Sequence, residues 1–95
     1  MSVYVIVYLE EVFDQAKLDE YRRIGVPALR ASPAKILVRN GAFEMLEGEA
    51  PQSVVMLEFP DKASAKAWYD SPTYQEALTH RFAGARCRAL MVEGV

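Results

Sequence analysis

The sequence contains a single cysteine, Cys87, and a single histidine, His80. One thiol cannot form an internal disulfide, and one histidine with one cysteine is too small a ligand set for a zinc or non-haem iron site. Cys87 lies in a strand-like segment, where a lone cysteine usually serves as a small apolar side chain. This scarcity argues against disulfide-stabilised folds and metal clusters.

Neither sign of charge dominates the chain, which has 11 basic and 13 acidic residues and a net charge of −2. Nucleic-acid binding needs a basic face for the phosphates, so no such partner is expected. No apolar run approaches the ~20 residues that span a bilayer, and Met1-Ser2 lead directly into a strand-like segment without a basic leader. These absences predict a cytoplasmic protein with no membrane partner.

Linkers, internal repeats and low-complexity segments are also missing, so residues 1–95 are predicted to form one domain. A chain this short buries only about 60–65% of its unfolded surface when it folds alone. Its hydrophobic share is nevertheless high, at 52%. This combination suggests apolar surface that another molecule covers.

Two segments are apolar at both odd and even positions, which is typical of central strands covered on both faces. They are residues 3–9 and residues 53–59, the second interrupted by Glu58. Residues 35–39 and 86–93 are also strand-like. The pattern predicts four strands, with the first and third in the centre of the sheet.

The first helical region follows the first strand. Asp14 is placed to cap a helix whose apolar residues recur at spacings of three and four. Pro27 lies inside that pattern, where it removes one backbone hydrogen bond and clashes with the preceding turn. We therefore expect a kink or a break after Val26.

The second helical region is divided by a proline. Asp61 is placed to cap a helix that ends near Tyr69. Ser71 and Pro72 then suit the N-cap and first position of a further helix, because proline has no N–H to lose there. This helix is expected to run to about residue 81.

Residues 35–39 are followed by Asn40-Gly41 and by another strand-like segment at residues 42–47. Asn-Gly favours a hairpin between two antiparallel strands, whereas a bulge at Gly41 would bend one long strand. We favour the bulge, because residues 48–52 form a better chain reversal. The resulting register pairs Leu46 near Val54 and Ala42 near Glu58.

The order β-α-β-β-α-β predicts an α+β, ferredoxin-like subunit, with an antiparallel four-stranded sheet and helices on one face. The other face would be apolar and uncovered in a monomer. Roughly six to eight such side chains, at about 1.5–3 kcal/mol each, amount to ~10 kcal/mol or more. The simplest cover is a second copy packed sheet against sheet, which makes a two-fold homodimer.

Several pieces of the sequence carry a family resemblance. They are Tyr4-Val5-Ile6-Val7, Glu20-Tyr21-Arg22, Val38-Arg39-Asn40-Gly41, Leu46-Glu47-Gly48, Glu58-Phe59, Trp68-Tyr69-Asp70-Ser71-Pro72-Thr73-Tyr74-Gln75, Arg81 and Val92-Glu93-Gly94. In this order and spacing they resemble the domain of unknown function 1330 family, within the dimeric α/β barrel superfamily. The resemblance implies a ferredoxin-like subunit that pairs into a barrel, and it brings no established activity.

Glu58 is the candidate catalytic residue, because a carboxylate that lines a half-dry barrel has the raised pKa that a general base needs. Lys35 or Arg39 on the neighbouring strand would instead neutralise it in a structural ion pair. The planar guanidinium of Arg39 is also suited to an anionic ligand.

Four further residues are candidates for ligand binding. The phenol of Tyr8 can donate to a carbonyl or phenolate ligand, although the residue also suits the core. Tyr74 offers an aromatic wall near the restart of the helix. Ser71 is first a cap, and the free N–H groups after it can accept an anion. Arg81 can serve the C-terminal helix dipole, or reach Glu58 or a ligand.

These residues predict a homodimeric barrel that binds a small organic molecule between sheet and helices, without metal or other cofactor. The superfamily resemblance implies an alternative, a cofactor-independent oxygenase or isomerase that acts on an aromatic or polyketide-like substrate with Glu58 as base. A structural or regulatory dimer with a filled barrel is a second alternative. Related barrels that use a helix histidine to bind haem imply haem at His80, for which a solvated histidine near a helix C-terminus is the competing interpretation.

Overall fold

The computed structural model describes residues 1–95, which form four strands and three helices. The strands are β1 (Val3–Val12), β2 (Lys35–Arg39), β3 (Ser53–Phe59) and β4 (Ala85–Glu93). The helices are α1 (Gln15–Arg30), α2 (Lys62–Tyr69) and α3 (Pro72–Gly84). This order confirms the predicted α+β, ferredoxin-like subunit, with the second helical region divided into α2 and α3.

The four strands form one antiparallel sheet in the order β2-β3-β1-β4, with β1 and β3 in the centre as predicted. In the middle of β1, Ile6 lies opposite Met56 of β3 and Leu90 of β4. Because side chains alternate along a strand, the odd-numbered residues within 3–9, 53–59 and 87–93 share one face, and the even-numbered residues share the other. The pairing of β1 with β4 becomes irregular after Leu9.

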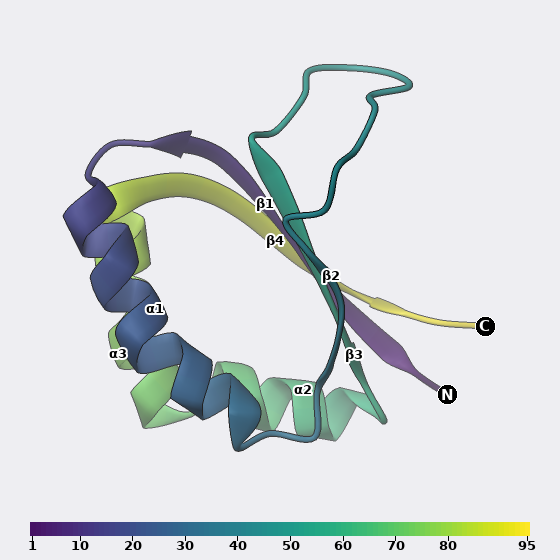
Figure 1. The fold of residues 1–95 in the computed structure, drawn as a ribbon. Coiled ribbons are helices and arrows are strands. Elements are labelled where there is room, and N and C mark those ends of the chain that lie inside the picture. Colours follow the sequence, from purple (N-terminus) through teal and green to yellow (C-terminus); the bar gives the residue numbers. More distant parts are fainter.

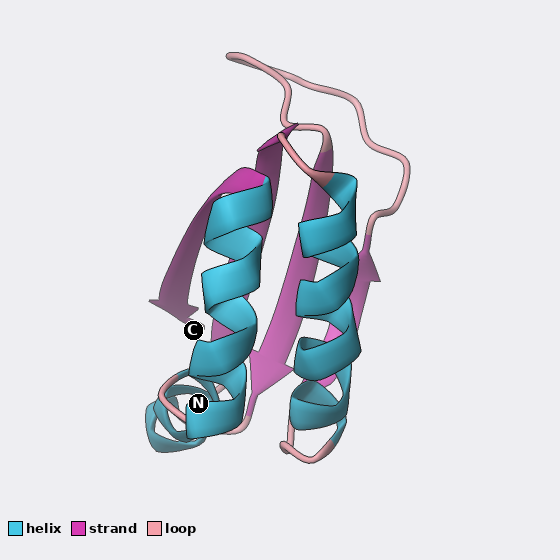
Figure 2. Cartoon of the chain, turned by 90° about the vertical axis from the view of Figure 1, so that its left-hand side faces the viewer, coloured by secondary structure: helices cyan, strands magenta, loops and turns pink.

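All three helices lie on one face of the sheet (Figures 1 and 2). The odd-numbered strand residues point toward them and form the core with α2 and α3. The buried members of this core are Val3, Val5, Leu57, Phe59, Ala65, Trp68, Tyr74 and Leu78. No helix combines the length and the hydrophobicity needed to cross a membrane.

Each helix begins at the residue that the sequence predicted as its cap. The cap bonds are Ala16 N–H to Asp14 Oδ1 (3.0 Å), Ser64 N–H to Asp61 Oδ1 (2.7 Å) and Tyr74 N–H to Ser71 Oγ (3.2 Å). Pro72 occupies the first turn of α3, where its missing N–H is no loss. The caps therefore fix where α1, α2 and α3 start.

Of the predicted kink or break after Val26, the break is wrong, because α1 continues through Pro27 to Arg30. Pro27 itself is exposed, whereas Ala28 and Leu29 after it pack against the core. Packing on both sides of the proline offsets the lost hydrogen bond, which costs about 3 kcal/mol in a helix interior.

The second half of the predicted long strand, residues 42–47, is not a strand, so both the hairpin and the bulge at Gly41 are wrong. Residues 40–52 form an irregular loop that extends beyond the sheet (Figure 1). Asn40 adopts a positive φ of 53° and donates its N–H to the carbonyl of Val54, after which the chain leaves the sheet. Apolar residues form a strand only against a partner strand, and residues 42–47 have none.

The register of β2 against β3 also differs from the prediction. Lys35 lies opposite Glu58, and the irregularity falls between Ile36 and Val38 rather than at Gly41. The predicted neighbours Ala42 and Leu46 lie in the loop. The irregularity lets both Ile36 and Arg39 reach the helix side of the sheet.

The face of the sheet turned away from the helices is apolar and is not covered by any part of the subunit (Figure 1). Besides the charged Glu58 and Arg88, its even-numbered side chains are Tyr4, Ile6 and Tyr8 of β1, Val54 and Met56 of β3, and Leu90 and Val92 of β4. We call this set the outer face. Leu90 and Val92 remain 46% and 45% exposed, which is unusual for large apolar side chains in strands.

Candidate functional site

A cavity of about 380 Å³ lies between the helices and the sheet. It is lined by nineteen residues, of which twelve are hydrophobic, and every helix and strand contributes at least one. Cavities of this size and composition are typical of small-molecule sites, which start at about 300 Å³.

The cavity has a buried floor and an exposed rim. The floor contains Leu18, Leu57, Trp68, Tyr74 and Arg81, all buried. The rim contains Arg22, Val26 and Arg30 from α1, and Ile36 and Arg39 from β2, all exposed. The cavity therefore opens between α1 and β2, and its far end lies under α2 and α3.

Aromatic side chains make the floor flat and rigid. The ring of Trp68 lies 4.3 Å from that of Tyr74 and 5.4 Å from that of Phe59, and Tyr21 meets Tyr74 edge-on at 6.1 Å. The helix restart at Ser71 brings Trp68 and Tyr74 together from consecutive helices. The indole Nε1 of Trp68 is buried and has no hydrogen-bond partner.

Two phenols and one guanidinium form the polar part of the floor. The hydroxyls of Tyr21 and Tyr74 are hydrogen-bonded at 2.8 Å, and Arg81 Nη1 donates to Tyr74 Oη at 3.4 Å. The Arg81 guanidinium also lies over the Tyr21 ring, 5.3 Å from its centre. Burial raises the pKa of Tyr74 far above that of a free phenol, so both its proton and its donor capacity persist at neutral pH.

Arg81 is buried, with only 4% of its surface exposed. None of the ion pairs of the chain includes it, and its Nε–H has no acceptor. Burial opposes its charge, but the oxygens of Tyr74 and Tyr21 favour it, and its pKa lies above the ordinary arginine value. Arg81 is therefore a buried cation without an anion.

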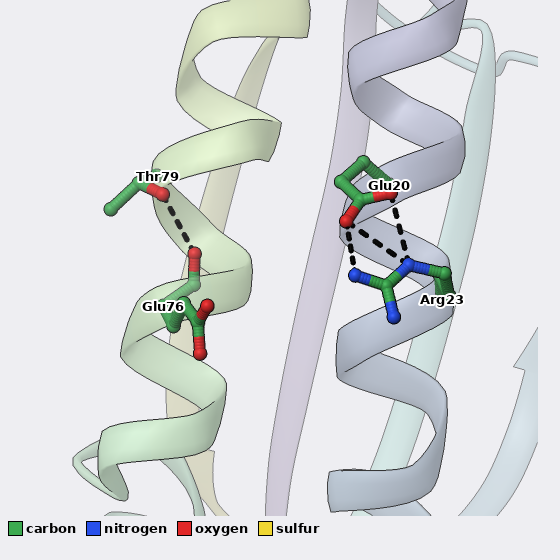
Figure 3. Close-up of polar contacts among 4 residues, drawn as sticks. All are labelled: Glu20, Arg23, Glu76 and Thr79. Atoms are coloured by element: carbon green, nitrogen blue, oxygen red, sulfur yellow. Dashed lines mark hydrogen bonds and ion pairs between the residues drawn. The ribbon is translucent and has the colours of Figure 1, made fainter.

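Other arginines of the chain do have carboxylate partners. Arg23 of α1 is paired with Glu20 on the exposed side of that helix (Figure 3). Its side chain is 69% exposed and does not line the cavity. The contrast shows that Arg81 lacks a partner because of its position, not because acids are scarce in this chain.

Cys87 also lines the cavity, from the start of β4. Burial raises the pKa of its thiol, and the nearby Arg81 counteracts this only in part. A thiol with a raised pKa stays protonated at neutral pH and is a poor nucleophile. Cys87 is thus an apolar wall residue of the cavity, in agreement with its prediction as a small core side chain.

The structure brings together three of the six candidate site residues. Arg39, Tyr74 and Arg81 all line the cavity, the first at the rim and the other two on the floor. Ser71 does not line it. Its hydroxyl accepts the N–H of Tyr74 and donates to the carbonyl of Trp68 at 2.8 Å, so Ser71 positions two residues that do.

Tyr8 and Glu58 lie on the opposite side of the sheet from the cavity. Tyr8 belongs to the outer face, where Arg88 packs over its ring at 5.3 Å from the centre. Glu58 lies opposite Tyr4 and Lys35 in the two strand registers, and it forms no ion pair. The subunit therefore separates the candidate base from the candidate ligand-binding residues.

His80 does not line the cavity, so it does not fit as the axial ligand of a haem held there. No three histidine, cysteine or acidic side chains gather closely enough to hold a metal ion.

The cavity residues that the sequence did not single out include Tyr21 and the rim arginines Arg22 and Arg30. Tyr21 and Arg22 were named only within the pieces that carry the family resemblance, and the hydroxyl of Tyr21 was the available signal. The two arginines flank the same apolar stripe, one helical turn before and after Val26, and only the opening beside β2 distinguishes them from ordinary surface residues.

The fold is shared with several solved structures. The RPA0582 protein of unknown function from Rhodopseudomonas palustris is 22% identical, with 99% of this chain and 82% of that chain covered and a TM-score of 0.78. A dimeric ferredoxin-like protein of unknown function from Jannaschia sp. CCS1 is 19% identical, with 99% and 100% covered and a TM-score of 0.76. The cofactor-independent oxygenase SnoaB from Streptomyces nogalater is 11% identical, with 99% and 93% covered and a TM-score of 0.69.

No curated protein matches the chain. The model of the family described as Domain of unknown function (DUF1330) matches residues 2–95. The chain therefore belongs to the DUF1330 family, as its sequence motifs indicated.

Proposed function

We propose that this member of the DUF1330 family is a homodimer in which each subunit binds a small, largely apolar organic molecule between its sheet and its helices. The observation that carries the proposal is the cavity of about 380 Å³, which has an aromatic floor and an opening between α1 and β2. Clefts of about 300–1,000 Å³ that are lined mostly by hydrophobic side chains are the usual form of small-molecule sites.

The second part of the proposal is that two copies pack through their outer faces. Burying these apolar side chains, at about 1.5–3 kcal/mol each, would contribute as much as the whole stability of a small domain. Structural neighbours of the chain are described as dimeric ferredoxin-like proteins, which supports a dimer. The cavity lies on the helix side of the sheet, so dimerisation through the outer face leaves its opening free.

The geometry favours binding over catalysis by Glu58. A general base must come within about 2.6–3.2 Å of the proton that it removes, directly or through one water. Glu58 lies on the side of the sheet away from the cavity and cannot reach a molecule bound there. The polar residues that line the cavity include four arginines and the phenols of Tyr21 and Tyr74, which can bind and orient a ligand.

Trp68 provides the test, because it is the only tryptophan and lies on the cavity floor. Its fluorescence can be excited at the red edge of tryptophan absorption while 3-phenylpropan-1-ol and 3-phenylpropanoate are titrated as probes. We expect saturable binding of at least one probe. Val55→Phe, which fills the cavity from β3, should weaken that binding by about tenfold or more.

The control is Thr79→Phe, which adds the same aromatic ring to the exposed side of α3 (Figure 3). Binding should be unchanged in this variant. Equal affinity of the native protein and Val55→Phe would show that the probes bind elsewhere and would refute the proposed site.

A further inference from the structure

We infer that the ligand is a monoanion, an organic carboxylate with an apolar body, whose carboxylate binds Arg81 on the cavity floor. The inference rests on the proposed function and adds the chemical class of the ligand. It comes from the charges and hydrogen-bond donors that line the cavity.

All charged side chains around the cavity have the same sign. Arg22, Arg30, Arg39 and Arg81 line it, and no aspartate or glutamate does. The chain as a whole has more acidic than basic residues, with a net charge of −2. A positive cavity in a weakly acidic protein attracts an anion and repels a cation.

The floor lacks an acceptor that its donors need. Arg81 Nη1 makes one long bond of 3.4 Å to Tyr74, and Arg81 Nε–H and Trp68 Nε1–H make none. Buried donors in native structures nearly always have partners, and a buried guanidinium is costly without an anion. A carboxylate supplies two acceptor oxygens and one negative charge in the planar geometry that a guanidinium matches.

The Arg81 Nε–H, which has no acceptor, is shielded from water in the subunit. The flexible side chain of arginine allows the guanidinium to turn toward an oxygen that enters the cavity. The hydrogen bond from Arg81 Nη1 to Tyr74 Oη is long, at 3.4 Å, and therefore weak enough for a ligand carboxylate to replace it.

Size and polarity select a monoanion. The single buried guanidinium balances one negative charge, whereas a phosphate dianion would need more buried donors than this floor provides. The twelve hydrophobic residues of the lining require a ligand whose remaining atoms are apolar. The other three arginines lie at the exposed rim, where they attract the anion without binding it at depth.

The test compares two probes of nearly the same shape, 3-phenylpropanoate and its neutral amide 3-phenylpropanamide, by the fluorescence of Trp68. The native protein should bind the carboxylate about tenfold or more tightly than the amide. Arg81→Met keeps most of the side-chain volume and should abolish this preference, whereas Arg81→Lys should retain part of it.

Arg23→Met is the matched control, because it removes an arginine of α1 that lies outside the cavity and already has a carboxylate partner (Figure 3). It should keep the native preference. Circular dichroism establishes whether each variant is folded, and the comparison of the two probes on the native protein needs no variant at all.

Three other results would contradict different parts of the inference. Equal binding of both probes by the native protein would overturn the carboxylate class while leaving the proposed function intact. A preference that persists in Arg81→Met would overturn the role of Arg81 and move the anion to the rim. Failure of both probes to bind would overturn the proposed function and this inference together.

Discussion

Gly84→Ala should destabilise the protein, whereas the same replacement at Gly25 should stabilise it. A Cβ on Gly84 would lie 2.9 Å from the carbonyl oxygen of Asp14 and 3.0 Å from the backbone nitrogen of Leu18. These are backbone atoms of the first turn of α1, which cannot move independently. The same turn is attached to Gly84, whose carbonyl accepts the N–H groups of Phe13 at 2.7 Å and Asp14 at 3.1 Å.

The alanine at position 84 must therefore push α1 and α3 apart or break these hydrogen bonds. Overpacking of this kind costs about 1–3 kcal/mol. A loss of about 2 kcal/mol lowers the melting temperature of a domain of this size by roughly 8–16 °C.

Gly25 lies in the interior of α1, and a Cβ there would contact Tyr21 at 3.5 Å and Ala77 at 3.6 Å, which are ordinary van der Waals distances. Alanine then contributes its higher helix propensity, about 0.5–1 kcal/mol. Thermal and urea unfolding, followed by circular dichroism at one protein concentration, measure both effects. A Gly84→Ala variant as stable as the native protein would contradict the described contact between α1 and α3.

Three further predictions test other parts of the structure. Ile6→Glu places a charge at the centre of the outer face and should convert the proposed dimer to monomer or aggregate in sedimentation. Phe13→Glu, at an exposed position outside that face, should leave the sedimentation of the native protein unchanged. Tyr74→Phe leaves the hydroxyl of Tyr21 and the guanidinium of Arg81 without their shared partner, and should cost about 1–3 kcal/mol in urea unfolding. Hydrogen bonds from Ser64 lower the pKa of Asp61, so its contribution to stability is present above the unfolded value of about 3.9 and is lost as the pH falls below it. Asp61→Asn should flatten the decline of melting temperature in that acid range, and an unchanged decline would contradict the cap.

The sheet was predictable because its two central strands are apolar at both parities. Residues 3–9 and 53–59 have no polar face, so the strand order followed from the pattern. The division between α2 and α3 followed from Ser71 and Pro72, whose cap geometry is local. Local capping residues and hydrophobic periodicity were thus sufficient to predict most of the strands and helices of the subunit.

Residues 42–47 were mispredicted because strand formation depends on a partner, which composition does not reveal. The continuity of α1 through Pro27 depends likewise on tertiary packing. Both the loop at residues 42–47 and the continuity of α1 depend on tertiary contacts, which the local sequence does not specify.

The candidate site could be predicted only in part. Alternation along a strand shows that Tyr8 shares a face with Ile6, and Glu58 with Met56, but it does not show which face the helices cover. The buried state of Arg81 was also invisible, because its place near the end of a helix is equally typical of a solvated arginine. Only the folded structure shows that Arg81 is buried without a carboxylate partner, whereas the other three arginines of the cavity lining are exposed.

The most direct test of the cavity is a nuclear magnetic resonance titration of methyl-labelled protein with 3-phenylpropanoate. Val55 and Leu57 of β3 point into the cavity, whereas Val54 and Met56 of the same strand point to the outer face. We predict nuclear Overhauser contacts from the phenyl protons to the methyl groups of Val55 and Leu57. Contacts to Val54 and Met56 instead, or none to either pair, would contradict a binding site between the helices and the sheet.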